Sequence, residues 1–208
     1  MIVGILGGGQ LGRMLALAGY PLGLRFRTLD LSSEAPAGPL TELMVADFND
    51  TDALKRFAGG LDVATYEFEN VPVDSARFLE RRVLVYPPSI ALEVGQDRLS
   101  EKTFFQKLGI PTPPFIAVDT WDELKEALNK IGLPAVLKTR RFGYDGKGQF
   151  ILRRAEDAAT AWQSLGGVPL ICEGFIPFDR EVSILAIRSR SGQAASLNRN
   201  GRRRCGSR

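Results

Sequence analysis

The sequence predicts an α/β protein with an N-terminal parallel βαβ domain at residues 1–97, followed by an α+β domain at residues 98–190. In the first part, short apolar runs of β type alternate with short helical stretches, which is typical of βαβ units and a parallel sheet. After Pro87 and Pro88 the pattern changes, and two β-type runs lie close enough together to form a hairpin. The 208 residues suffice for one large domain or two small ones.

The first part begins with an apolar run that no charged leader precedes, so we expect a first strand there rather than a signal peptide. The β-type runs are residues 2–6, 24–29, 61–66 and 83–86, and the helical stretches are residues 11–18, 52–58 and 75–81.

The second part begins with a charged amphipathic helix at 97–108 and an extended linker at 109–114. Thr120 and Glu123 have the spacing of a capping box, which predicts a helix to about Ile131. The remaining predicted elements are the hairpin strands 134–138 and 149–152, a helix at 155–165, and strands at 170–173 and 181–187 that complete an antiparallel set.

Composition excludes several kinds of chemistry. The chain has no histidine, which removes Ser-His-Asp and Cys-His nucleophiles and His-ligated zinc. Cys172 and Cys205 do not have the spacing of metal ligands and are too few for a disulfide framework. We therefore expect the protein to reside in a reducing cytoplasm. No apolar run approaches the ~18 residues of a membrane span, so we expect no membrane partner.

The net charge of +3 comes from the C-terminal end of the chain. The last fifteen residues hold five arginines and no acid, so residues 1–193 carry 22 basic against 24 acidic side chains, or −2. The body of the protein is therefore nearly neutral.

A glycine-rich turn follows the first predicted strand. Residues 7–12 read G-G-G-Q-L-G and fit G-x-G-x-x-G, and Asp30 ends the second strand. Such a turn directs backbone amides and the positive end of a helix at an anion, and the acid could bind a ribose. A dinucleotide site, a generic phosphate site and a purely structural turn all fit. The later hairpin argues against the dinucleotide, since a Rossmann domain continues with more parallel strands.

Two acids follow the third predicted strand, at the edge where open parallel sheets hold their ligands. Glu67 and Glu69 point to the same face if the strand continues. They could hold ribose hydroxyls or a cationic amine, or they could be solvated carboxylates at a strand end.

Lys138 and the residues between the hairpin strands suggest a phosphate site. Residues 143–148 read G-Y-D-G-K-G, whereas a simple hairpin needs only two or three turn residues. The glycines permit close backbone approach, and Lys138 and Lys147 supply positive charge. The alternatives are a loose turn and a lysine whose head reaches solvent.

Two further acids could bind a nucleotide. Glu173 follows a β-type run and could accept a hydrogen bond from the exocyclic amine of adenine, while Glu181 could accept from ribose hydroxyls. Each could equally be a solvated carboxylate beside a strand.

Six stretches of the sequence resemble one known family. They are G-G-G-Q-L-G-R-M-L at 7–15, T-Y-E-F-E-N-V at 65–71, Q-D-R at 96–98, K-T-F-F-Q-K-L-G-I-P-T-P at 102–113, P-A-V-L-K-T-R-R-F-G-Y-D-G-K-G-Q at 134–149, and E-G-F-I-P-F-D-R-E-V-S at 173–183. The chain resembles the 5-(carboxyamino)imidazole ribonucleotide synthases of the ATP-grasp superfamily over about residues 1–190. The resemblance implies a Rossmann-like pre-ATP-grasp domain followed by an incomplete ATP-grasp domain.

The resemblance also implies roles for residues that match the family's motifs. The implied ATP-binding residues are Arg98, Lys138, Gly143, Tyr144, Asp145, Gly146, Lys147, Gly148, Gln149, Glu173, Gly174, Phe175, Ile176 and Glu181. Gln10, Leu11 and Glu67 would meet the aminoimidazole ribonucleotide. Tyr144, Asp145 and Lys147 would lie close to the reacting groups as catalytic residues, with Asp145 able to accept the amine proton.

The implied activity is that of an ATP-dependent carboxylating ligase of purine biosynthesis. In the family, ATP phosphorylates bicarbonate to carboxyphosphate, which breaks down to carbon dioxide, and the substrate's exocyclic amine attacks that carbon. Phosphoryl transfer relies on positioning and electrostatics, which suits a chain without histidine. The resemblance implies ATP and Mg²⁺ as cofactors and a homodimer as a possible assembly, with no nucleic-acid partner.

The resemblance ends after Arg188, where the family continues with its magnesium ligands and the rest of the ATP-grasp domain. Residues 191–208 form a basic tail that could be a nucleic-acid-binding arm. We favour a truncated or frameshifted copy, and we expect an exposed sheet edge, an apolar face and little synthase activity. Another ATP-grasp ligase or a non-catalytic nucleotide-binding fragment would also fit.

Overall fold

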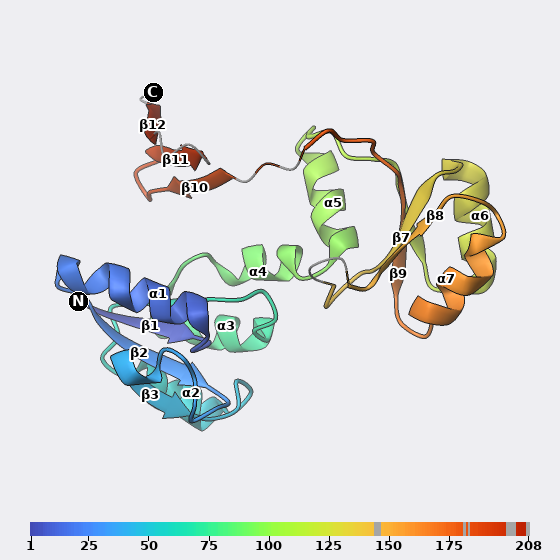
Figure 1. Cartoon of the computed structure of the whole chain (residues 1–208). Coiled ribbons are helices and arrows are strands. Elements are labelled where there is room, and N and C mark those ends of the chain that lie inside the picture. The colour runs from blue at the N-terminus through green and yellow to red at the C-terminus, as the bar shows by residue number, and fades with distance from the viewer. Residues whose placement is uncertain (144–146, 181, 183, 199–202, 207–208) are drawn as a thin grey trace. The chain divides into compact units, whose positions relative to one another are not determined.

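The structure is a computed structural model, and it describes residues 1–143, 147–180, 182, 184–198 and 203–206 (Figure 1). The chain divides into two compact units, Met1–Gly174 and Phe175–Arg208.

The N-terminal part of the first unit is a five-stranded parallel sheet in the order β3-β2-β1-β4-β5. Its strands are β1 (Ile2–Leu6), β2 (Arg25–Asp30), β3 (Glu42–Val45), β4 (Val63–Tyr66) and β5 (Leu84–Val85). Its helices are α1 (Gln10–Gly19), α2 (Thr51–Ala58), α3 (Val73–Glu80) and α4 (Ser89–Gly95), with 3₁₀ turns η1 (Tyr20–Leu22) and η2 (Gly38–Leu40). The predicted parallel sheet is confirmed, whereas β3 and α4 were not predicted.

The two faces of this sheet have separate cores. Leu6 and Leu29 are partners in the β1–β2 register, and they belong to the same buried cluster as Phe57 of α2. Ile5, the neighbour of Leu6 in β1, packs instead in a cluster with Ala16 of α1. Because successive strand residues point to opposite faces, α1 covers one face of the sheet and α2 the other.

The second part of the first unit is a four-stranded antiparallel sheet in the order β6-β9-β7-β8. Its elements are α5 (Arg98–Lys107), β6 (Phe115–Val118), α6 (Trp121–Ile131), β7 (Ala135–Thr139), β8 (Gln149–Leu152), α7 (Asp157–Leu165) and β9 (Leu170–Gly174). The predicted hairpin is confirmed as β7 and β8. Strand β6 was not predicted, because the extended linker was expected to lead directly to a helix.

Helices α6 and α7 cover the same face of this sheet (Figure 1). Leu137 of β7 and Cys172 of β9 are register partners, and both are fully buried in the cluster beneath these helices. Lys138 and Glu173 are the next residues along their strands, so their side chains project from the opposite face. The alternation of the two strands therefore separates a dry core from a polar face.

The second unit contains a three-stranded antiparallel sheet made of β10 (Ile184–Arg188), β11 (Ala194–Asn198) and β12 (Arg203–Gly206). Residues 181–187 were predicted to form a strand that completes the antiparallel sheet of the hairpin, and this predicted pairing was wrong. The strand exists over Ile184–Arg188, but it pairs with β11. Ile184, Leu185 and Ile187 are 68–70% exposed.

Candidate functional site

A buried carboxylate lies at the centre of the polar face of the second sheet. Glu173 is only 3% exposed, and its Oε2 atom accepts a hydrogen bond of 2.9 Å from Nζ of Lys138. Nζ of Lys102 in α5 lies 3.4 Å from the same oxygen. Two lysines facing one acid leave this site with a net positive charge, which favours an anionic ligand.

The second oxygen of this carboxylate has no partner. Oε1 of Glu173 is buried, and no hydrogen bond to it occurs within the described residues. A buried charged acceptor without a donor is costly, so such an atom indicates a missing partner. A ligand that brings an N–H donor to this point would satisfy it.

The first residues of the glycine-rich loop are held in place from both sides. The backbone N–H of Thr139 donates to the carbonyl of Gly148 at 2.8 Å, and Nη2 of Arg98 donates to the carbonyl of Gly143 at 3.0 Å. The N–H of Arg98 also donates to the carbonyl of Arg140 at 2.9 Å. Arg98 therefore fixes the start of the loop through two separate bonds.

Gly148 is required by the geometry of the loop. Its φ is +69°, a value that favours glycine, and a Cβ atom there would lie 2.6 Å from Oγ1 of Thr139. Of the predicted loop residues, Tyr144, Asp145 and Gly146 lie outside the described residues. Their implied roles remain predictions.

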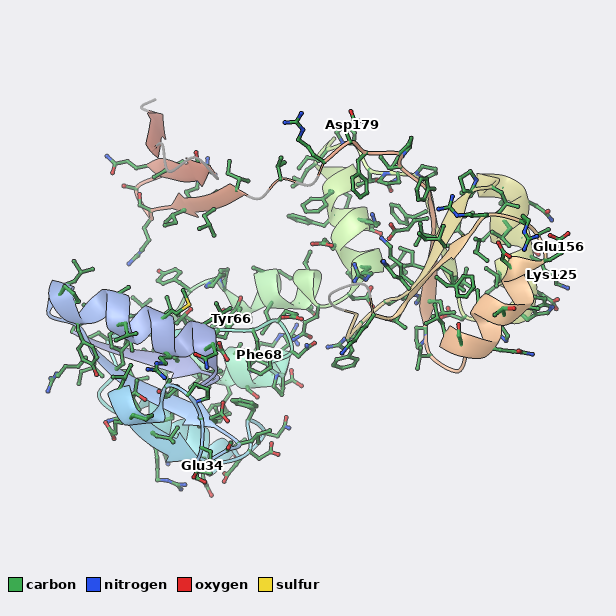
Figure 2. The ribbon with its side chains drawn as sticks, in the orientation of Figure 1. Glu34, Tyr66, Phe68, Lys125, Glu156 and Asp179 are labelled. Atoms are coloured by element: carbon green, nitrogen blue, oxygen red, sulfur yellow. The ribbon has the colours of Figure 1, made fainter. Side chains whose placement is uncertain are left out.

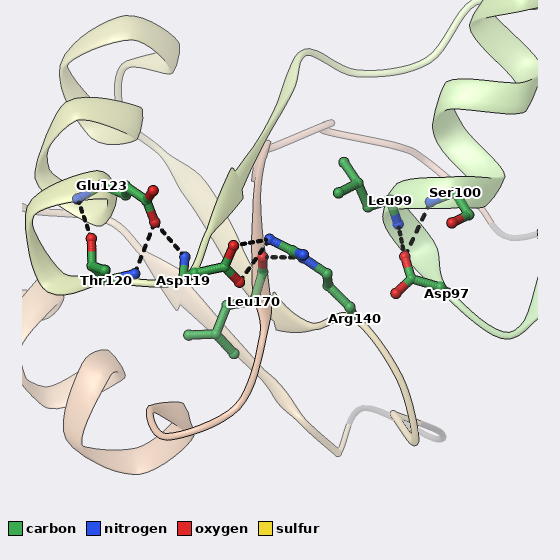
Figure 3. Close-up of polar contacts among 8 residues, drawn as sticks. All are labelled: Asp97, Leu99, Ser100, Asp119, Thr120, Glu123, Arg140 and Leu170. Carbon is green, nitrogen blue, oxygen red and sulfur yellow. Dashed lines mark hydrogen bonds and ion pairs between the residues drawn. The ribbon is translucent and has the colours of Figure 1, made fainter.

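The ends of β7 and α5 are fixed by further polar contacts (Figure 3). Arg140 donates from Nε to the carbonyl of Leu170 at 2.9 Å, and its Nη2 lies 2.9 Å from Oδ1 of Asp119. Asp97 caps α5 by accepting from the backbone N–H groups of Leu99 and Ser100 at 2.9 and 3.1 Å. These contacts anchor the ends of the two elements that carry Arg98 and Lys138.

Only some of the remaining predicted nucleotide-binding residues belong to the described part of the first unit. Gly174 ends β9, where its N–H donates to the carbonyl of Pro114 at 2.9 Å. Lys147 and Gln149 are exposed at the far side of the loop. Phe175 and Ile176 begin the second unit. Glu181 lies outside the described residues.

The N-terminal glycine turn binds carboxylates of the chain itself. The N–H of Gly8 donates to Oδ2 of Asp30 at 2.7 Å. The N–H groups of Gly9 and Gly12 donate to the two oxygens of Glu67 at 2.9 and 3.1 Å. These amides therefore hold internal anions, which favours the structural interpretation of the turn. The sequence did not indicate this role for Glu67, because 55 residues separate it from Gly12.

A cavity of about 340 Å³ lies where β4 ends. Tyr66 and Phe68 lie side by side there (Figure 2), and burial raises the pKa of the Tyr66 hydroxyl, with a smaller contribution from Glu80. The residues that line the cavity are Tyr66, Glu67, Phe68, Glu69, Pro87, Ala91, Leu92 and Gly95. Gln10 and Leu11 form the exposed first turn of α1 and are linked to this region through the contacts of Glu67 with Gly9 and Gly12.

Lys102 is part of the site and Gln96 lies outside the Glu173 cluster, and the sequence patterns assigned a role to neither. Lys102 lies in a charged helix, where a lysine is ordinarily solvated, and only the fold brings it to Glu173. Gln96 precedes the predicted Arg98 and is buried.

Within the described ranges, no group of three His, Cys, Asp or Glu side chains could hold a metal ion. In the same part of the chain, no helix is long and apolar enough to cross a membrane.

Two family models match the chain. The ribonucleotide synthetase preATP-grasp domain matches residues 1–96, and the ATP-grasp domain matches residues 103–203. The N5-carboxyaminoimidazole ribonucleotide synthase of Pseudomonas aeruginosa is 50% identical over 193 residues, which are 93% of this chain and 54% of that relative.

Solved structures give the same result. The N5-carboxyaminoimidazole ribonucleotide synthetase of Thermus thermophilus superposes with a TM-score of 0.86 at 62% identity, covering 94% of this chain and 52% of that protein. The synthase of Aspergillus clavatus, in complex with ADP and 5-aminoimidazole ribonucleotide, gives a TM-score of 0.83 at 25% identity, covering 94% and 53%. The chain spans about half the length of the curated relatives it matches. The chain is a homologue of the N5-carboxyaminoimidazole ribonucleotide synthases over about half of their length.

Proposed function

We propose that this chain supplies a nucleotide-binding face and an acceptor-substrate face to an ATP-dependent carboxylase of 5-aminoimidazole ribonucleotide. The observation that carries the proposal is the buried Glu173, which has one oxygen facing Lys138 and Lys102 and the other without a partner among the described residues. The names and bound ligands of the relatives support the identity of the substrates.

The nucleotide face combines charge with an unsatisfied acceptor. Oε1 of Glu173 would accept a hydrogen bond from the exocyclic amine of adenine, while Lys138 and Lys102 add positive charge to a site for phosphates. We assign further ATP contacts to Arg98, residues 143–149, residues 174–176 and Glu181. We also place the boundary between the two domains at residues 97/98.

The acceptor face would bind the aminoimidazole ribonucleotide through Gln10, Leu11 and Glu67. Its exocyclic amine is carboxylated at the expense of ATP and bicarbonate, and Tyr144, Asp145 and Lys147 would lie near the reacting groups. These residues would orient the amine and take up its proton. The described residues contain no group of three acidic, histidine or cysteine side chains for a metal ion, so any Mg²⁺ would be held mainly by the phosphates of the nucleotide.

Nucleotide binding can be tested on the chain itself by calorimetric titration with ADP. We expect Lys138→Met to weaken binding by about tenfold, since a charged contact to phosphate is lost. Lys130→Met is the matched control, because Lys130 is exposed and pairs only with Glu126 at 3.6 Å among the described residues. A wild-type chain that binds no ADP at millimolar concentration would contradict the proposal.

Carboxylation is proposed for the whole protein. Because the chain spans about half the length of its relatives, we expect the 208 residues to bind nucleotide but to turn over slowly. Phosphate release that depends on both bicarbonate and 5-aminoimidazole ribonucleotide measures this. A rate equal to that of the Pseudomonas aeruginosa relative would contradict this expectation, because it would show that residues 1–208 are sufficient for full carboxylation activity.

We further propose a reducing cytoplasmic location, which the buried free thiol of Cys172 supports. A homodimer is also proposed, and sedimentation equilibrium would test it.

A further inference from the structure

Gln96 is a buried amide that the proposed function does not use. It caps the C-terminal end of α4, and it is only 7% exposed. Its Nε2 atom donates to the carbonyl of Val71 at 2.6 Å, and its Oε1 atom accepts from Nη2 of Arg141 at 2.5 Å. The carbonyl needs a donor and the guanidinium needs an acceptor, so only this orientation of the amide satisfies both.

The two partners of Gln96 belong to different candidate faces. Val71 is fully buried in the core of the N-terminal sheet, four residues after Glu67, which binds the turn at Gly9 and Gly12. Arg141 lies at the start of the glycine-rich loop. One side chain thus joins the segment 67–71 to residues 140–143, which lie 69 or more positions further along the chain.

The residues that follow Gln96 strengthen this connection. Asp97 caps α5, which fixes the backbone direction at this point. Arg98 binds the carbonyls of Arg140 and Gly143. Gln96 and Arg98, on either side of Asp97, therefore both contact residues 140–143.

We propose that Gln96 is a positioning residue that couples the order of the segment 67–71 to the order of residues 140–143. Its amide is fully paired only when both partners are in place, and loss of either leaves a buried polar group unpaired. Ordering one side therefore favours order on the other, and the coupling acts equally in both directions. The ligand-dependent part of this coupling rests on the proposed function.

The direct test is hydrogen exchange of the whole chain without ligand. Gln96→Met keeps the size of the side chain and removes both hydrogen bonds. We expect amides in residues 67–71 and in residues 139–143 to exchange about 3- to 10-fold faster, with the rest of the chain unchanged. Gln106→Met, at an exposed glutamine in α5, is the control and should change neither segment. Faster exchange in only one segment, or in neither, would overturn the proposal.

A second variant covers the case in which Gln96→Met unfolds the chain. Arg141 is exposed, so Arg141→Met is compatible with folding, and it removes only the loop half of the connection. The proposal requires faster exchange in residues 67–71 as well as in the loop. A change confined to the loop shows that Gln96 serves only its own helix end, and it overturns the coupling.

Hydrogen exchange measured with ADP distinguishes a failure of this inference from a failure of the proposed function. In the wild-type chain, saturating ADP should slow exchange at residues 67–71, and Gln96→Met should abolish that slowing while ADP still binds. Slowing that persists in the variant contradicts the coupling. If ADP does not bind the wild-type chain, the proposed function fails, and the ligand-free comparison still decides the role of Gln96.

Discussion

Cys172 and Glu173 are neighbours in β9 with opposite surroundings. The thiol faces the apolar cluster beneath α6 and α7, and the carboxylate faces Lys138 and Lys102. The one-residue alternation of a strand is enough to produce both environments. The chemistry of each group follows from the face it occupies.

Cys172 should resist alkylation in the native protein. Burial, followed by the nearby charge of Glu173, raises the pKa of the thiol from 9.0 to about 11. At pH 8 about one thiol in a thousand is then ionised, against about one in ten at the ordinary value, and only the thiolate is nucleophilic. Iodoacetamide labelling at pH 8, read by mass spectrometry of the peptide, measures this. The same peptide should label readily in urea, and rapid native labelling would contradict the burial.

Gly148→Ala should damage the loop more than a comparable change elsewhere. The new Cβ would meet Oγ1 of Thr139 at 2.6 Å, in addition to the strain of a positive φ. Gly167→Ala is the matched control, because Gly167 also has a positive φ, of +87°, but has open space around it. We expect weaker ADP binding for Gly148→Ala only. Equal effects of the two changes would show that the contact with Thr139 is unimportant.

Helix α6 begins with a complete capping box, as the sequence predicted (Figure 3). Oγ1 of Thr120 accepts from the N–H of Glu123 at 3.2 Å. The Glu123 carboxylate accepts from the N–H groups of Asp119 and Thr120 at 2.7 and 2.9 Å. Asp119 in turn pairs with Arg140, so the helix start is joined to the end of β7.

The contribution of Glu123 to the free energy of unfolding should depend on pH. The N–H of Asp119 first, and that of Thr120 second, lower the pKa of this carboxyl below 4.5. A carboxyl whose pKa is lowered in the folded state stabilises the protein above pH 4.5. This contribution to the free energy of unfolding is lost as the pH falls through the pKa of the folded state. Urea midpoints of wild type and Glu123→Gln should therefore differ at pH 6 and converge toward pH 3. Glu126→Gln, on the same helix, is the control, and a gap that stays constant with pH would contradict the assignment.

The sequence predicts the buried strands better than the edge strands. Strands β1, β2 and β4 lie inside the parallel sheet; β1 reads as a continuous apolar run, whereas β2 mixes apolar residues with Arg25, Arg27 and Thr28. Strand β3 lies at an edge, has only four residues, and exposes Glu42 and Val45 at its two ends. Helix α4 begins after Pro88 without a side-chain cap, which removes the usual sign of a helix start.

Pairing across long distances is the part that the sequence does not predict. The strand at Ile184–Arg188 is expected from its composition, but composition does not name its partner. Lys138 and Glu173 are each expected to face a nucleotide, whereas their contact depends on the β7–β9 register across 35 residues. The contacts of Glu67, Lys102 and Gln96 depend on tertiary structure in the same way.

At the scale of the molecule, the first unit has a separate core on each face of its parallel sheet and a third core beneath α6 and α7, and the second unit begins at Phe175. Both tryptophans lie over the second sheet, where the rings of Trp121 and Trp162 are 6.1 Å apart. Their fluorescence therefore reports specifically on that sheet.

A chain that ends at Gly174 should fold like the full chain. It retains every strand of both sheets of the first unit, so the tryptophan emission and its thermal transition should be unchanged. A chain that ends at Val168 lacks β9, which lies between β6 and β7, and should show the emission of exposed tryptophan while circular dichroism retains the N-terminal sheet. Native emission from the shorter chain would refute the central role of β9.

The position of β9 also sets the order of events during synthesis. The N-terminal sheet has all its strands once residue 85 has left the ribosome, and domains near the N-terminus generally fold first. The second sheet must wait with β6 and β7 apart until β9 arrives between them. Glu173 is the penultimate residue of that strand. Under the proposed function, a nascent chain therefore acquires the acceptor for its nucleotide at nearly the last residue of the unit, so nucleotide could stabilise the finished unit but could not guide the folding that precedes it.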